Sequence, residues 1–352
     1  MDIYSTIKVK ASKSYDVLVC YNQLTEIGSV LAERFEPCKI AILTDNIVDA
    51  LYADIVISSL ENSGFHCIKH TIPNGEISKN MDSVLGFINL MAKEQITRSD
   101  MVLALGGGVV GDMAGFASAI YLRGIKYIQV PTTLLAAVDS SVGGKTAVDI
   151  SAGKNLIGAF NQPSLVFCDI NTLNTLPKNI MRDGFAEVIK YGIILDKDLY
   201  NTLLEPNNNN LLQIVTRCIE IKRDVVAADE FDKGERQLLN FGHTIGHSIE
   251  LLSNFTVTHG EAVAKGMVIA AKIGKECGYA DVTEQIKNIV EMYGFDTSCP
   301  YSAGELYSVA LSDKKRQKEN ITLVVPESIG KCVLHTIPTE ELLSLLNKIN
   351  YK

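Results

Sequence analysis

The sequence has no apolar run long enough to cross a membrane, and its N-terminus lacks the apolar core of a secretory signal. Its eight cysteines are scattered without a C-x-x-C pair, so we expect them to be reduced and buried. Positive charge is also in deficit: the formal net charge is −8 at pH 7, which argues against non-specific binding to nucleic acid. These absences predict a cytoplasmic globular protein with no membrane or nucleic-acid partner.

Two familiar catalytic motifs are incomplete. The zinc-protease pattern H-E-x-x-H fails because Thr244 follows His243 where that pattern needs glutamate. The Gly-Lys-Thr at residues 144–146 does not complete a nucleoside-triphosphate loop, since Asp139 stands where that loop needs glycine. A peptidase and a loop of this nucleotide-binding type are therefore disfavoured.

The chain of 352 residues is long enough for two domains, and its apolar fraction of 47% is typical of globular proteins. Strand and helix patterns alternate over residues 1–176, which predicts an α/β domain with a mostly parallel sheet. From residue 177 to 352 the pattern is mainly helical. Ligands of open parallel sheets gather at the carboxyl ends of the strands, where we expect a binding site.

A glycine-rich turn follows the apolar strand expected at 100–105. It reads Gly-Gly-Gly-Val-Val-Gly-Asp over residues 106–112 and leads into a helix of small residues. Such a turn lets backbone N–H groups approach a phosphate closely, at the positive end of a helix. No acidic residue ends the next strand, where Thr132 and Thr133 stand instead, so a tight strand–helix turn without a ligand remains an alternative. Asp45 and the Glu76…Lys79 pair are better placed to hold ribose or nicotinamide groups.

Three of the six histidines lie close together in the second half of the chain. His243 and His247 are four residues apart and share one helix face, and His259 follows a short break. Neutral imidazole is a common metal ligand, and Glu187 lies in a helix expected upstream. The sequence therefore predicts a metal site, with buried core histidines as the alternative.

Several cations stand in glycine-punctuated or helical contexts: Arg123, Lys145, Lys154, Lys190, Lys222, Arg236 and Lys314. On an acidic protein, such a set converging on one site would suit an anionic, phosphorylated substrate. The alternative for each is an ordinary surface cation. A metal ion beside a nicotinamide ring would imply oxidation of an alcohol.

Seven stretches together resemble one known family over nearly the whole chain: GGGVVGDMAGF, PTTLLAAVDSSVGGKT, GKNLIGAF, AEVIKYG, LNFGHTIGHSIE, THGEAVAKGM and the late Asp-Lys-Lys. The sequence resembles 3-dehydroquinate synthases, enzymes of the shikimate pathway to the aromatic amino acids. The resemblance implies an N-terminal NAD-binding α/β domain, a helical C-terminal metal-binding domain and a homodimer. It also implies zinc, or cobalt, held by Glu187, His243 and His259.

The resemblance further implies roles for two larger sets of residues. NAD contacts would come from Asp45, Glu76, Lys79, Gly107, Gly108, Asp112, Thr132, Thr133, Lys145 and Lys154. Substrate-binding and catalytic groups would be Asp139, Lys145, Lys154, Asn155, Lys190, Lys222, Arg236, Asn240, His247 and Lys314, with Arg123 reaching across the dimer interface. Three departures from the family pattern, Ala137, Asn161 and Asp232, leave the zinc set intact.

The implied reaction converts 3-deoxy-D-arabino-heptulosonate 7-phosphate to 3-dehydroquinate and phosphate. It proceeds by transient oxidation with NAD, β-elimination of phosphate, re-reduction and aldol cyclisation, so the enzyme would be a carbon–oxygen lyase. The rival hypotheses are another sugar-phosphate cyclase, such as 2-deoxy-scyllo-inosose synthase, and a metal-dependent polyol dehydrogenase. A non-catalytic nucleotide-binding protein is disfavoured because no expected ligand is lost.

Overall fold

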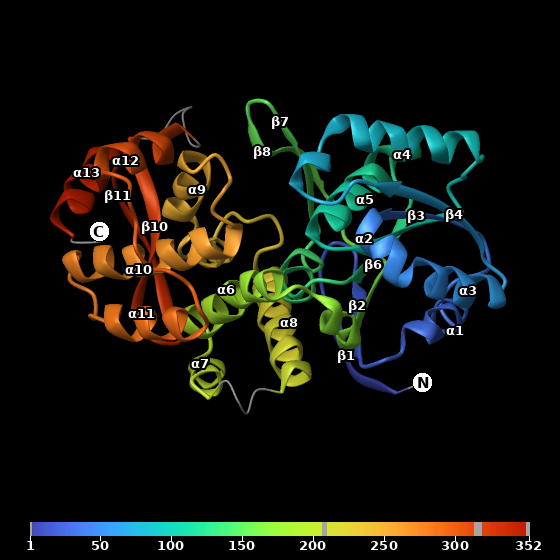
Figure 1. Ribbon diagram of the computed structural model, residues 1–352, viewed down its shortest axis with the longest axis horizontal. Helices are drawn as coiled ribbons and strands as arrows, with labels where there is room; N and C mark the ends of the chain where they lie inside the picture. The colour runs from blue at the N-terminus through green and yellow to red at the C-terminus, as the bar shows by residue number, and fades with distance from the viewer. Residues whose placement is uncertain (1, 206–209, 313–318, 350–352) are drawn as a thin grey trace. The chain divides into compact units, whose positions relative to one another are not determined.

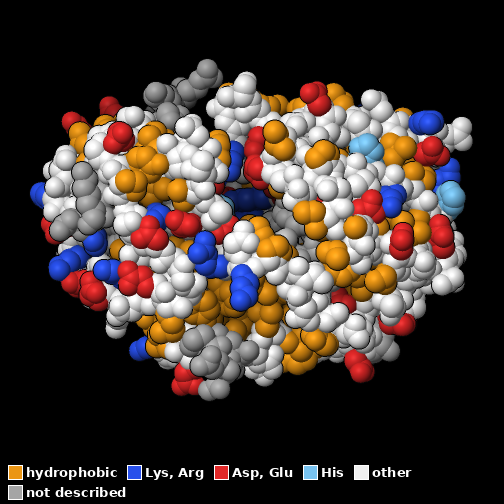
Figure 2. Space-filling view, viewed as in Figure 1, with side chains coloured by type: hydrophobic (Ala, Val, Ile, Leu, Met, Phe, Trp, Pro, Cys, Tyr) orange, Lys and Arg blue, Asp and Glu red, His pale blue; other side chains and the backbone are white. Residues whose placement is uncertain are grey.

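The computed structural model describes residues 2–205, 210–312 and 319–349. Contacts between residues divide the chain into two compact units. The first comprises Met1–Pro177 with Leu211–Phe231, and the second comprises Lys178–Asn210 with Asp232–Lys352. Within the described residues, every helix is too short or too polar to span a bilayer. Acidic and basic side chains are interspersed on the face shown in Figure 2.

The first unit is built on a seven-stranded sheet in the order β1-β2-β9-β6-β5-β3-β4 (Figure 1). β1 and β2 pair antiparallel, and all other neighbours in the sheet are parallel. The strands are β1 (Ile3–Val9), β2 (Tyr15–Cys20), β3 (Lys39–Asp45), β4 (His66–Ile72), β5 (Met101–Gly106), β6 (Lys126–Pro131) and β9 (Leu165–Asp169). The prediction of a mostly parallel sheet is confirmed.

Successive residues of the central strands enter two different cores. Ile40 and Leu103 pack into one hydrophobic cluster with α1 and α3, whereas Ala41 and Val102 pack into another with α4 and α5. Because side chains alternate across a strand, a strand covered on both faces reads as a continuous apolar run. The helices are α1 (Ile27–Ala32), α2 (Asn46–Val48), α3 (Asp54–Asn62), α4 (Met81–Lys93) and α5 (Gly108–Ile120). Short helical segments lie at 24–26, 49–53, 76–78, 121–123, 136–140 and 170–175.

Two further elements complete the first unit. A small antiparallel hairpin is formed by β7 (Lys145–Ile150) and β8 (Gly153–Phe160). Helix α8 (Leu211–Ala228) packs with β1 and with the segment at 136–140. We expected this helix among residues 177–352 of the second domain, but its contacts group it with the first unit.

The second unit is mainly helical, as predicted, with one antiparallel hairpin of β10 (Asn320–Ser328) and β11 (Lys331–Pro338). Its helices are α6 (Lys178–Ile194), α7 (Lys197–Leu203), α9 (His243–Leu252), α10 (His259–Glu276), α11 (Thr283–Met292), α12 (Ala303–Ser312) and α13 (Thr339–Lys348), with a short segment at 235–240. One core cluster joins Ile245 of α9, Ile269 of α10, Leu306 of α12 and Leu345 of α13 to the hairpin. This core fixes α9 and α10 against each other.

Candidate active site

The predicted metal ligands converge within the second unit. Glu187 lies in the middle of α6, His243 is the first residue of α9 and His259 is the first residue of α10. The Nε2 atoms of His243 and His259 lie 3.5 and 3.4 Å from the same oxygen, Oε1 of Glu187. One candidate ligand atom from each residue lies within 4.8 Å of the others. A carboxylate and two imidazoles from three helices form a donor set that suits zinc and related divalent ions.

Glycines allow the helices that carry these ligands to pack closely. A Cβ on Gly266 of α10 would lie 2.0 Å from the carbonyl oxygen of Gly242, the left-handed residue before α9. A Cβ on Gly260 would lie 2.5 Å from the carbonyl oxygen of Asp183 in α6. A side chain at either position would push the backbones apart. The small residues therefore set the spacing at which His243, beside Gly242, meets Glu187.

The two histidines predicted as ligands have pKa values shifted in opposite directions. Burial and the nearby Lys190 lower the pKa of His243 to about 3, so its imidazole is neutral, as a metal ligand must be. Burial also lowers the pKa of His259, but hydrogen bonds and charges from Glu187 and Glu250 outweigh this effect and raise it to about 10. These carboxylates therefore stabilise a positive charge on the His259 ring. A divalent cation at Nε2 would have to displace that proton, and it would be stabilised by the same two carboxylates.

Glu250 is a member of this cluster to which the sequence analysis gave no role. Its Oε2 lies 3.6 Å from Nδ1 of His259, and its side chain is 5% exposed. Together with His247 and His259 it makes a second group of possible metal ligands. The signal in the sequence was its spacing: positions 243, 247 and 250 follow one face of a helix.

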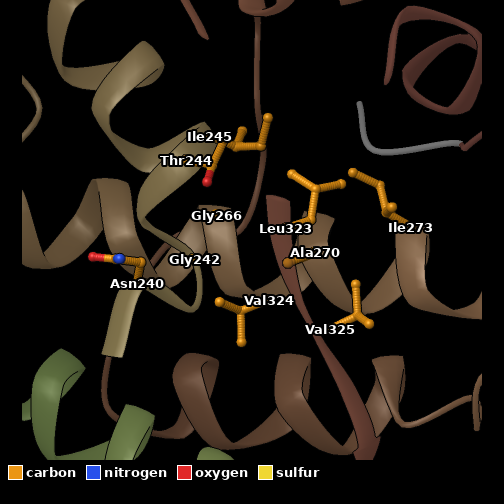
Figure 3. A pocket seen from close by; sticks show the side chains of 10 residues that line it. All are labelled: Asn240, Gly242, Thr244, Ile245, Gly266, Ala270, Ile273, Leu323, Val324 and Val325. Atoms are coloured by element: carbon orange, nitrogen blue, oxygen red, sulfur yellow. The ribbon is translucent and has the colours of Figure 1, made fainter. Parts of the chain in front are cut away.

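Two of the other groups expected in this unit, Lys190 and His247, lie against the cluster. Lys190 is almost fully buried and contacts Oε2 of Glu187. Arg236 is buried in the segment before α9, and Asn240 is exposed. Asn240 lines a small pocket with Gly242, Thr244, Ile245, Gly266, Ala270, Ile273, Leu323, Val324 and Val325 (Figure 3). The ring centroid of His247 lies 5.4 Å from that of His243, and Lys314 lies outside the described residues.

In the first unit, the glycine-rich turn joins β5 to α5 as expected. Gly107 is the N-cap residue of α5 and Gly108 its first residue. The backbone N–H of Thr132 donates to the carbonyl oxygen of Gly106 at 3.0 Å. A Cβ on Gly107 would lie 3.0 Å from Cγ2 of Thr133, so the turn and the end of β6 pack directly together. The result is a helix N-terminus with little side-chain bulk, suited to a phosphate.

Lys79 connects three elements near this turn. Its Nζ lies 2.6 Å from Oδ2 of Asp112 in α5 and donates to Oδ1 of Asn155 at 2.7 Å. Burial alone would lower the pKa of Lys79, but Asp112 and Glu76 raise it, so the ammonium stays charged. The Nζ of Lys154 lies 3.8 Å from Oε1 of Glu76. The structure therefore brings together five predicted residues from three separate stretches of the sequence.

The other predicted residues of the first unit are more dispersed. Lys222 of α8 is buried and donates to the side-chain Oδ1 and the backbone oxygen of Asp139. Asp45 ends β3, and its Oδ1 accepts the backbone N–H groups that open α2. Lys145 is exposed at the start of β7. Arg123 is exposed in a left-handed conformation, with φ of 67°.

Comparison with known proteins identifies relatives of the whole chain. Family models described as 3-dehydroquinate synthase N-terminal and C-terminal match residues 69–183 and 184–316. The 3-dehydroquinate synthase of Streptococcus suis strain 05ZYH33 is 44% identical over 342 residues, which cover 94% of this chain and 96% of the relative.

Two solved structures share the fold. A 2-deoxy-scyllo-inosose synthase complexed with carbaglucose-6-phosphate, NAD⁺ and Co²⁺ aligns with a TM-score of 0.87 at 25% identity and covers 98% of this chain and 100% of its own. The 2-epi-5-epi-valiolone synthase of Streptomyces hygroscopicus subsp. jinggangensis 5008, with NAD⁺ and Zn²⁺ bound, aligns at 0.84 with 24% identity and covers 99% and 98%. The first is the rival cyclase weighed from the sequence, and its identity is well below the 44% of the S. suis enzyme. On the two family models and the identity over nearly its full length, the chain belongs to the 3-dehydroquinate synthase family.

Proposed function

We propose that this chain carries out the family's reaction with the two residue groups described above, the metal ligands of the second unit and the dinucleotide residues of the first. The substrate would be 3-deoxy-D-arabino-heptulosonate 7-phosphate, and the enzyme a phosphate-eliminating carbon–oxygen lyase. The observation that carries the proposal is the convergence of His243 and His259 on one oxygen of Glu187. A relative that is 44% identical supports the choice of substrate.

The metal would be held by Glu187, His243 and His259. A divalent ion bound there supplies a Lewis acid that acidifies a substrate hydroxyl. Three protein ligands are the usual number at a catalytic zinc site, and an ion held by them would also be able to take up that hydroxyl. Zinc suits the mixed oxygen and nitrogen donors, and the cobalt of the similar 2-deoxy-scyllo-inosose synthase supports cobalt as an alternative.

The dinucleotide would be held along the carboxyl ends of β3 and β5. Bound NAD supplies a reversible hydride acceptor, and it is regenerated in each turnover. The N-terminus of α5 at Gly107 and Gly108 would bind its phosphates, and Asp45 would accept hydrogen bonds from ribose hydroxyls. Lys79, fixed by Asp112, would place a permanent cation beside the nicotinamide end. Glu76, Thr132, Thr133, Lys145 and Lys154 complete the proposed set.

The substrate's anionic groups would be bound by lysine and arginine side chains. Lys190 and Arg236 are nearly fully buried, so each would interact strongly with a carboxylate or phosphate. The other proposed substrate groups are Arg123, Asp139, Lys145, Lys154, Asn155, Lys222, Asn240 and Lys314. His247 is held on α9 beside the ligands, and its imidazole would move a proton to or from the substrate.

One assay tests this function against both rivals. The purified chain, supplied with catalytic NAD and zinc, is expected to release phosphate from the heptulosonate phosphate without net accumulation of NADH. Steady NADH accumulation would instead indicate a dehydrogenase. Faster phosphate release from another sugar phosphate would indicate a different cyclase. The matched control is His243→Ala, which should release no phosphate above background.

We further propose a cytoplasmic location and a homodimer. The eight free cysteines support a reducing compartment. The dimer follows from the family resemblance, in which Arg123 serves the partner's active site. Light scattering would measure the mass, and a monomer with full activity would contradict this part of the proposal.

A further inference from the structure

Each proposed histidine ligand presents its two ring nitrogens to different neighbours. In both rings Nε2 faces Oε1 of Glu187, at 3.5 Å for His243 and 3.4 Å for His259. The Nδ1 of His243 lies 3.1 Å from the backbone carbonyl oxygen of Phe241. The Nδ1 of His259 lies 3.6 Å from Oε2 of Glu250. Both rings therefore direct Nε2 to a common point and Nδ1 to an oxygen acceptor.

Glu250 is an unusual residue to find inside this unit. Its side chain is 5% exposed on α9, and burying a carboxylate is costly unless charges or donors compensate. It lies seven residues after His243, two helical turns along the same face, and that face meets the N-terminal end of α10. The charge of Glu250 is thus placed beside the imidazoles of the cluster and not in solvent.

We infer that Glu250 is a positioning residue for the metal ligand His259. Its carboxylate would accept the Nδ1–H of His259, which leaves the lone pair of Nε2 directed at the ion. The backbone carbonyl of Phe241 would do the same for His243. Such outer acceptors fix the tautomer and orientation of a ligand imidazole and raise its basicity. This inference rests on the proposed function, because it takes Glu187, His243 and His259 as the metal ligands.

The same residues offer one other arrangement, in which His247, Glu250 and His259 hold an ion of their own. Since Nδ1 is the nitrogen of His259 that faces Glu250, His259 would then bridge two ions. A bridging imidazole must lose both ring protons, whereas the positioning role needs only the neutral ring. The geometry therefore favours one ion, with Glu250 outside its ligands.

The test measures metal affinity and not only activity. Full-length wild-type protein, Glu250→Gln and Glu250→Leu are stripped of metal, and Zn²⁺ is titrated in competition with a chromophoric chelator. The expected result is a loss of affinity of about 10- to 100-fold, smaller for Gln because it keeps an acceptor oxygen. With Co²⁺ as the probe, the visible absorption spectrum should also shift as His259 reorients. Circular dichroism of the metal-free proteins checks the fold, and if the Leu variant does not fold, the Gln variant decides.

Glu261→Gln is the matched control. Glu261 lies in the first turn of α10, as His259 does, but its carboxylate pairs with Arg182 and Lys265. An equal loss of metal affinity in this variant would mean that any nearby negative charge has the same effect as Glu250. That result would overturn the inference. Two Zn²⁺ ions per wild-type chain would also overturn it. Wild-type protein that binds no ion would instead contradict the proposed function.

Discussion

Gly266 of α10 lies so close to Gly242 that a Cβ added to Gly266 would be only 2.0 Å from the Gly242 carbonyl oxygen. The next residue after Gly242 is His243, a proposed metal ligand, so the packing of these two backbones positions one side of the proposed metal site. The sequence stretches LNFGHTIGHSIE and THGEAVAKGM, which contain these two glycines, do not show that the glycines meet. Their close approach makes a helix interior position, where alanine is normally the better residue, intolerant of a methyl group.

We predict that Gly266→Ala destabilises the protein by at least the roughly 1–3 kcal/mol typical of an overpacked core, and that it weakens metal binding. The backbone of α9 must move to admit the methyl group, and His243 moves with it. Urea unfolding and zinc competition measure the two effects. The control is Gly304→Ala in α12, where an added Cβ meets nothing within 4 Å. That change should be neutral or stabilise by up to about 1 kcal/mol, and equal losses in both variants would contradict the close-approach argument.

The ion pair between Lys79 and Asp112 provides a second prediction. Their atoms are 2.6 Å apart and both side chains are largely buried, at 7% and 16% exposure. Asp112→Ala leaves the Lys79 ammonium without its carboxylate, which should cost about 3–5 kcal/mol of unfolding free energy. It should also weaken NAD binding, measured by calorimetry, because Lys79 is then no longer fixed.

The control for that prediction is an exposed pair of the same length. Lys331 and Glu327 are also 2.6 Å apart, but their side chains are 66% and 45% exposed. Glu327→Ala should change the unfolding free energy by no more than about 0.5 kcal/mol, because solvent screens the pair. If both substitutions had the same small effect, burial would not govern the strength of the Lys79 pair.

The sequence was sufficient for elements whose signal is local. The apolar run at 100–105 predicted a strand, which the structure contains as β5, and the glycine-rich turn after it predicted the start of α5. It was insufficient where the outcome depends on long-range packing. Nothing local to α8 shows that it packs on β1, and nothing local to residues 145–160 shows that they pair as the hairpin of β7 and β8.

The candidate site likewise combines features that the sequence predicted with features that only long-range packing determines. The four-residue spacing of His243 and His247 indicated a metal site, but it could not show which of them faces Glu187. That assignment came from the family resemblance, and it remains a prediction for each residue's role. The spacing of Glu250 from His243 and His247 places it on their helix face, but spacing alone cannot separate a buried carboxylate from a solvated one. Its burial depends on α10, which lies against α9.

The two histidines of α9, His243 and His247, should differ in their contributions to metal binding and to turnover. We predict that His243→Ala abolishes metal retention, because it removes one of three converging ligands. His247→Ala should retain the metal and slow turnover, since its ring lies beside the ligands rather than against Glu187. Metal content after dialysis and the rate of phosphate release measure the two properties. Equal metal loss in both variants would show that this division of roles is wrong.

Asp100, in the turn before β5, predicts a pH dependence of stability. Burial raises its pKa, but this is outweighed by the N–H and hydroxyl of Thr97 at 2.6 and 2.8 Å and the N–H of Lys39 at 2.9 Å, so its pKa is below the ordinary 3.8. Because the folded-state pKa is lower than the unfolded one, Asp100 contributes stability above the unfolded pKa and loses it as the pH falls through the folded pKa. Asp100→Asn should therefore destabilise the protein at neutral pH, since an amide cannot accept all three donors. Urea unfolding from pH 7 downward should show the gap between wild type and variant shrinking only below about pH 4. A gap that stays constant through the acid range would show that the hydrogen bonds do not depend on the charge of Asp100.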